Sequence, residues 1–159
     1  MRAGFDGVYL DKVDEYEQVK DNPDARDQMI ALVKALAGRA RALRPGFLVV
    51  PQNAEELLTD ADYRAAIDGI GKEDLLFGEI RNKRPNRPAR IESGVALLKL
   101  LTRDGKPVFV VEYLDAPQEI ALARKQLEDH GFVPLFADRA LDLIRDGDLP
   151  PPGRRPGRR

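Results

Sequence analysis

The chain has 159 residues, of which 43% are hydrophobic, so it is long enough to form one domain with a buried core. It contains no cysteine, which excludes disulfides and thiolate metal sites, and no apolar run approaches the roughly 18 residues of a membrane-spanning helix. The net charge is −1, and subtracting the four arginines between positions 154 and 159 leaves −5 for the rest. An acidic body suits neither DNA nor RNA, so we expect no nucleic-acid partner and no membrane span.

Short, continuously apolar segments alternate with helical patterns along the chain. We predict strands at residues 7–10, 47–50, 67–71, 108–111 and 132–136. The first helix is predicted to start with Asn22 as its N-cap and Pro23 in its first turn, and to run to Leu43. A second helix is predicted over residues 54–66, and an exposed polar loop over residues 81–87.

The later helices carry clearer end signals. One contains Ile91 to Leu101 and is closed by Gly105, and the next is predicted to begin at an acidic capping box at Asp115 and to end at Gly131. A last helix is predicted to hold Leu141 and Ile144. Beyond it, residues 150–159 are only Pro, Gly and Arg, so we predict a folded domain over residues 1–148 and a disordered tail over residues 149–159.

Buried strands joined by helices indicate an α/β fold with a parallel sheet. Two architectures fit this pattern. One is an open flavodoxin-like sheet of five strands, and the other is a partial (β/α)8 TIM barrel made of five consecutive units. In both, functional sites form at the carboxyl ends of the strands, so the residues after each strand are the candidates for chemistry.

Polar residues follow every predicted strand. They are Asp11 and Asp14 after the first, Gln52 and Asn53 after the second, Glu73 after the third, Glu112 and Tyr113 after the fourth, and Asp138 and Arg139 after the fifth. The only histidine, His130, is predicted to be a surface residue at a helix end, and no serine or cysteine is arranged for nucleophilic catalysis. We find no diagnostic metal-ligand spacing and no phosphate-binding glycine loop, so we expect neither a metal nor a cofactor.

Carboxylate chemistry remains, and Asp11 and Glu73 form the best pair. Two facing carboxylates suit the cleavage of a glycosidic bond, because one must be protonated to help the leaving oxygen depart while the other must be ionised. Their separation decides between retention and inversion of the sugar configuration, so the sequence leaves that choice open.

Five motifs resemble glycoside hydrolase family 114, whose members are similar to endo-α-1,4-polygalactosaminidases. They are GFDGVYLD at residues 4–11, followed by Asp14; PQN at 51–53; IDGIGKE at 67–73; VVEY at 110–113; and GFVP at 131–134. In order, they resemble the fourth to eighth strands of that family's barrel. The resemblance implies that Asp11 and Glu73 are catalytic, and that Asp14, Gln52, Asn53, Glu112 and Tyr113 bind the substrate.

The implied substrate is an α-1,4-linked galactosamine polymer, whose protonated amines an acidic cleft would attract. The resemblance also implies a secreted or cell-envelope protein, although we detect no signal peptide in this chain. Because the first three barrel strands have no counterpart, we expect either a missing N-terminal half or self-association as a partner. Two alternatives stay open: a non-catalytic or vestigial carbohydrate-binding half-barrel, and a flavodoxin-like regulatory module with Asp11 as phosphoacceptor.

Overall fold

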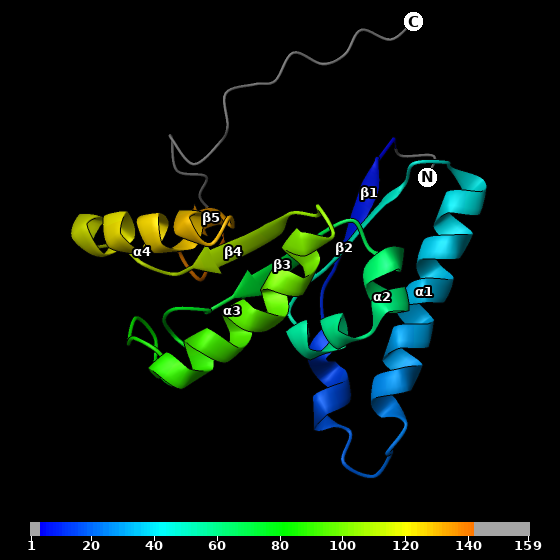
Figure 1. Ribbon diagram of the computed structural model, residues 1–159, viewed down its shortest axis with the longest axis horizontal. Helices are drawn as coiled ribbons and strands as arrows, with labels where there is room; N and C mark the ends of the chain where they lie inside the picture. The colour runs from blue at the N-terminus through cyan, green and yellow to red at the C-terminus, as the bar shows by residue number, and fades with distance from the viewer. Residues whose placement is uncertain (1–3, 142–159) are drawn as a thin grey trace, which may run out of the picture.

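The computed structural model describes residues 4–141 as an α/β domain with five short strands (Figure 1). The strands are β1 (Gly7–Leu10), β2 (Leu48–Pro51), β3 (Ile70–Glu73), β4 (Val108–Glu112) and β5 (Val133–Phe136). The α-helices are α1 (Ala25–Leu43), α2 (Ala61–Ala66), α3 (Pro88–Arg103) and α4 (Pro117–Asp129), and two 3-10 helices are η1 (Val13–Gln18) and η2 (Glu55–Thr59). None of the helices within residues 4–141 has the length and apolar character needed to cross a membrane.

All strand pairings are parallel, and neighbours in space are neighbours in sequence. β1 pairs with β2, while β3, β4 and β5 form a second sheet in that order. A bridge between Gln52 and Gly71 joins the two sheets, and the backbone N–H of Asp68 donates to the carbonyl of Val49 at 2.8 Å. A flavodoxin-like sheet would place the first strand between the second and third. The observed order therefore excludes that alternative.

The two faces of the sheet differ in their cover. Side chains that alternate onto one face are buried under the helices, among them Val49, Ile70, Val108, Val110 and Phe136. Figure 1 shows α1, α2 and α3 along one side of the strands. The pairing register places another set of apolar side chains on the opposite face, where they keep 36 to 50% of their surface exposed: Tyr9, Leu48, Phe109, Val133 and Leu135. Within residues 4–141, the strands are therefore covered on one face only.

The predicted helices form for the reasons that their sequences suggested, with local exceptions. The first is α1, which begins at Ala25 with Asp24 at the N-cap position, two residues beyond the predicted start. Asn22 instead accepts a hydrogen bond from the backbone N–H of Asp24 at 3.0 Å, which makes a turn before the helix. The prediction of Asn22 as the N-cap was therefore wrong.

The second exception is the helix predicted over residues 54–66, which is two separate pieces, η2 and α2. Asp60 interrupts it, because its backbone is extended and its carboxylate accepts the backbone N–H of Tyr63 at 2.7 Å. An aspartate that binds a nearby N–H starts a new helix rather than continuing the previous one.

The third strand is shifted relative to its prediction, from residues 67–71 to Ile70–Glu73. Asp68 lies before the strand, where its carboxylate binds Arg41 at 2.6 Å and the backbone N–H of Val49 at 2.7 Å. The ladder with β4 starts only at Ile70. Glu73 is therefore the last residue of β3, whereas the sequence analysis placed it after the strand.

Two further predictions concern the C-terminal part. Asp115 does not cap α4, because Ala116 occupies the N-cap position without a side-chain hydrogen bond, and Asp115 forms an ion pair with Lys83 instead. The last predicted helix begins at Leu141, which has a left-handed φ of 53° and is the final described residue. The rest of that helix, including Ile144, and the tail at 149–159 lie outside the described residues.

Candidate active site

Four of the predicted site residues share the open face at the carboxyl edge of the sheet. In a strand, alternate residues point to the same face, so Asp11 follows the orientation of Tyr9, and Tyr113 that of Phe109. Gln52 pairs with Gly71, and Glu73 lies two residues further along the same strand. The register thus brings Asp11, Gln52, Glu73 and Tyr113 to one edge of one face.

Glu73 is held by a tyrosine. The hydroxyl of Tyr113 donates a hydrogen bond to the Glu73 carboxylate, and burial together with this bond raises the pKa of the Tyr113 hydroxyl above its ordinary value. The guanidinium of Arg139 lies 4.4 Å from the centre of the Tyr113 ring, and it donates to both carboxylate oxygens of Asp74 at 2.9 and 3.0 Å. Tyr113 is only 5% exposed, so in this structure its hydroxyl orients Glu73.

Asp11 is exposed just beyond the end of β1. One of its carboxylate oxygens accepts the backbone N–H of Lys12 at 2.8 Å, in a turn where Lys12 has a left-handed φ of 65°. The pKa of the Tyr9 hydroxyl is raised to about 12, first by burial and then by the negative charges of Glu73 and Asp11. Both carboxylates therefore lie close enough to Tyr9 to act on the same hydroxyl.

Tyr9 is a site residue that the sequence reasoning missed. It lies two residues before Asp11 on the same strand, so alternation alone would have predicted that the two side chains share a face. Its hydroxyl reaches across β2 to Gly71, where a Cβ atom would lie only 1.8 Å from the hydroxyl oxygen. Gly71 therefore makes room for the tip of the Tyr9 side chain.

Asn53 supports the site from its backbone side. Its side-chain oxygen accepts the backbone N–H of Glu73 at 3.1 Å, and its own backbone N–H donates to the carbonyl of Gly71 at 2.7 Å. Asn53 has a left-handed φ of 58°, a conformation that asparagine tolerates better than most residues. These bonds tie the end of β2 to the end of β3 and fix the backbone of Glu73.

Glu112 lies on the helix-covered face and is completely buried. Its carboxylate accepts the backbone N–H groups of Leu76 at 2.6 Å and Phe77 at 3.2 Å. Burial raises the pKa of Glu112 to about 7, against the opposing effect of those hydrogen bonds. The expected contact of Glu112 with a sugar stays a prediction, whereas the structure shows this carboxylate anchoring the segment after β3.

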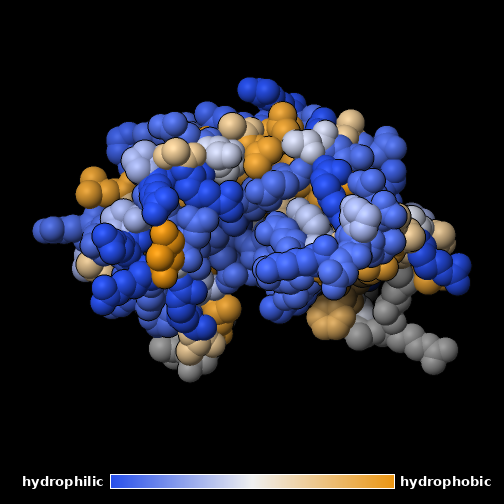
Figure 2. Space-filling view, turned by 90° about the horizontal axis from the view of Figure 1, so that it is seen from below, coloured by the Kyte–Doolittle hydropathy of each residue, from blue (hydrophilic) through white to orange (hydrophobic). Residues whose placement is uncertain are grey.

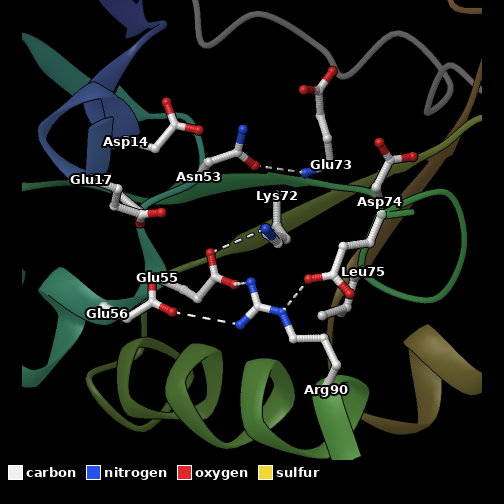
Figure 3. Close-up of a pocket in the computed structure, with 12 residues that line it drawn as sticks. Asp14, Glu17, Asn53, Glu55, Glu56, Lys72, Glu73, Asp74, Leu75 and Arg90 are labelled. Atoms are coloured by element: carbon white, nitrogen blue, oxygen red, sulfur yellow. Dashed lines mark hydrogen bonds and ion pairs between the residues drawn. The ribbon is translucent and has the colours of Figure 1, made fainter. Parts of the chain in front are cut away.

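A cleft of about 210 Å³ lies beside Glu73 and is lined largely by charged side chains, Asp14 among them (Figure 3). Glu55, at 2% exposure, forms ion pairs with Lys72 at 3.2 Å and Arg90 at 3.4 Å. Arg90 also pairs with Glu79 at 2.7 Å. In Figure 3 the Glu73 side chain points away from these ion pairs. Sequence reasoning found neither Glu55 nor Arg90, because their partners are 11 or more residues away in the chain.

A metal centre and the histidine are two further candidates for chemistry. Residues 4–141 contain no group of three or more His, Cys, Asp or Glu side chains that could hold a metal ion. His130 directly follows α4 and contacts the ring of Phe132, with 5.7 Å between ring centres. It precedes β5 and so belongs to the amino edge of the sheet, opposite to Asp11 and Glu73.

Sequence relatives of the chain come from distant organisms. It is 38% identical over 144 residues to an uncharacterized protein of Deinococcus radiodurans, and 31% identical over 161 residues to the uncharacterized protein MJ1477 of Methanocaldococcus jannaschii. Each match covers 91% of this chain and 46% of the relative. The chain therefore spans about half the length of these relatives.

A solved structure shares the fold. The glycoside hydrolase domain of PelA from Pseudomonas aeruginosa superposes with a TM-score of 0.68 and 19% sequence identity, over 90% of this chain and 57% of that one. The E218A variant of the same domain gives the same values. Finally, the model of glycoside-hydrolase family GH114 matches residues 1–148, and the chain belongs to that family.

Proposed function

We propose that the five strands are five consecutive units of a (β/α)8 barrel. Three observations support this: the parallel strands follow one another in chain order, the helices cover one face, and the other face carries partly exposed apolar side chains such as Leu48, Phe109 and Val133. In a closed barrel that face would be the packed interior. Further strands, from a longer polypeptide or a partner chain, would be needed to cover it.

We infer that the protein is a glycoside hydrolase that acts on an α-1,4-linked galactosamine-containing polysaccharide. The observation that carries this proposal is the strand register, which brings the carboxylates of Asp11 and Glu73 to the carboxyl edge of the same open face. Family GH114 membership supports the reaction class. The acidic groups beside Glu73, including Asp14 and Glu17, would favour a polymer that carries protonated amines.

The chemistry follows from the two carboxyl groups. The protonated one donates its proton to the glycosidic oxygen, and the bond from the anomeric carbon to that oxygen breaks with its electron pair left on the oxygen. The ionised one either attacks the anomeric carbon or removes a proton from a water that does so. In both routes a water oxygen ends on the anomeric carbon, and one water is consumed for each bond cleaved.

The structure suggests how the work is divided among the neighbouring residues. Tyr113 and Asn53 hold the side chain and the backbone of Glu73, while Gln52 lies on the open face between β1 and β3, where it would contact the sugar. Asp14 would extend the acidic cleft. Secretion or placement in the cell envelope would bring such a protein to its polysaccharide and is part of the proposal.

The release of reducing ends from an α-1,4-linked galactosamine polymer tests the function. We expect Asp11→Asn and Glu73→Gln each to lower the rate by about 10² to 10⁴, since each removes a group that takes part in proton transfer or attack. Asp62→Asn is a matched control, because Asp62 is an exposed carboxylate on α2 that pairs with Lys34. Wild-type rates in either site variant would contradict the assignment. Polymer binding without any release by the wild type would favour the non-catalytic carbohydrate-binding alternative.

A further inference from the structure

Tyr9 occupies an unusual position for an aromatic residue of a parallel sheet. Tyr9 keeps 50% of its surface exposed, yet its hydroxyl lies against the backbone of Gly71, two strands away. A Cβ on residue 71 would lie 1.8 Å from the hydroxyl oxygen and 2.6 Å from the ring carbon that bears it. Only glycine at this position allows the hydroxyl to lie where it does.

The hydroxyl of Tyr9 is also uncommitted. The Glu73 carboxylate receives its hydrogen bond from Tyr113, and Asp11 receives one from the backbone of Lys12. Within residues 4–141, no hydrogen bond involves the Tyr9 hydroxyl, although Asp11 and Glu73 both raise its pKa. A half-buried hydroxyl on the same face as the two candidate catalytic carboxylates is thus left free to bind a ligand.

We propose that the Tyr9 hydroxyl hydrogen-bonds the sugar unit bound between Asp11 and Glu73, with the Tyr9 ring forming the floor beneath it. A tyrosine suits this task because it offers an apolar ring and a polar tip. Gly71 fixes the position of the Tyr9 ring, because its missing side chain leaves the space that the hydroxyl fills. The inference rests on the proposed function, since it names a further substrate-binding residue at that same site.

Tyr9→Phe tests the inference, because it removes the hydroxyl and keeps the ring. A neutral hydrogen bond contributes about 0.5 to 1.5 kcal/mol, so we expect kcat/KM on the galactosamine polymer to fall about two- to tenfold. Affinity for a galactosamine oligomer, measured by isothermal titration calorimetry on the Glu73→Gln variant, should fall by a similar factor when Tyr9→Phe is added. An unchanged kcat/KM and an unchanged affinity would overturn the inference.

Tyr63→Phe is the matched control. The Tyr63 hydroxyl is buried and is the one buried side-chain polar atom without a hydrogen-bond partner among the described residues. Removing it should leave kcat/KM and affinity at wild-type values and leave the midpoint of thermal unfolding unchanged or higher. A loss in Tyr63→Phe equal to that in Tyr9→Phe would mean that both act through general stability, and would also overturn the inference.

Gly71→Ala gives a second, independent variant. The new methyl group must displace the Tyr9 tip, so we expect a loss at least as large as that of Tyr9→Phe. Wild-type activity in a folded Gly71→Ala protein, with its fold checked by circular dichroism, would contradict the proposal. If the wild type cleaves the polymer and Tyr9→Phe equals it, only the Tyr9 inference fails. If the wild type neither binds nor cleaves, the proposed function fails as well.

Discussion

Lys72 and Glu73 are consecutive residues of β3, yet they belong to two different environments. Lys72 points to the helix-covered side, where it is 13% exposed and pairs with the buried carboxylate of Glu55. Glu73 points to the open side, near Tyr9 and Asp11, and none of the ion pairs of the described residues includes it. Within residues 4–141, Glu55 on the covered side has two cation partners, whereas Asp11 and Glu73 on the open side form no ion pair.

The difference shows two roles for carboxylates in this protein: Glu55 stabilises the fold, whereas Asp11 and Glu73 are available for chemistry. A buried carboxylate such as Glu55 is tolerated because cations surround it, and its contribution is to hold η2, β3 and α3 together. The open-side pair, Asp11 and Glu73, forms no ion pair among the described residues. Such a pair can instead exchange protons with a bound substrate.

The largest effect is expected from breaking the covered-side cluster. Glu55→Ala would leave Lys72 without its buried partner, so we expect the free energy of unfolding to fall by about 3 to 5 kcal/mol. Glu56→Ala is the control: Glu56 contacts Arg90 at 3.5 Å but its side chain is 44% exposed, so we expect a change below about 1 kcal/mol. Urea unfolding measures both values. Equal, small losses would mean that the Glu55 cluster is not structural.

A second covered-side test concerns pH. Burial raises the pKa of Glu112 to about 7 in the folded state, from 4.5, so the folded state binds its proton more tightly than the unfolded state does. The resulting stability is present below about pH 4.5 and is lost as the pH rises through 7, by roughly 3 kcal/mol. Glu112→Gln should flatten this dependence in urea unfolding between pH 5 and 8. The same slope in the wild type and the variant would assign the dependence to another group.

A smaller effect is expected on the open side from Tyr113→Phe. The variant keeps the ring under Arg139 but releases Glu73, so we expect kcat to fall about tenfold, which corresponds to about 1.4 kcal/mol. KM should change little, because the hydroxyl orients a catalytic group rather than the sugar. A raised KM with an unchanged kcat would instead restore the substrate contact that the sequence predicted for Tyr113.

The predictions from sequence were best where the signal was local. Apolar runs located all five strands, within a few residues, and the proline and glycine positions located most helix ends. The errors in element boundaries arose where a polar side chain binds a partner that the local sequence does not indicate. The Asp68 carboxylate binds Arg41 and the backbone N–H of Val49, and β3 begins two residues after it. The Asp60 carboxylate caps α2 and so divides the helix predicted over residues 54–66. These choices depend on contacts that no local pattern contains.

The sequence by itself determined the fold class, the family and the two carboxylates at strand ends, because these follow from periodicity and from motifs of adjacent residues. Only the tertiary structure decided which polar groups are free. The buried Glu112 carboxylate accepts hydrogen bonds from backbone N–H groups 35 and 36 residues away. The Tyr9 hydroxyl lies against Gly71, across an intervening strand. Strand register places these atoms together, and register is set by long-range pairing rather than by the residues next to them in the chain.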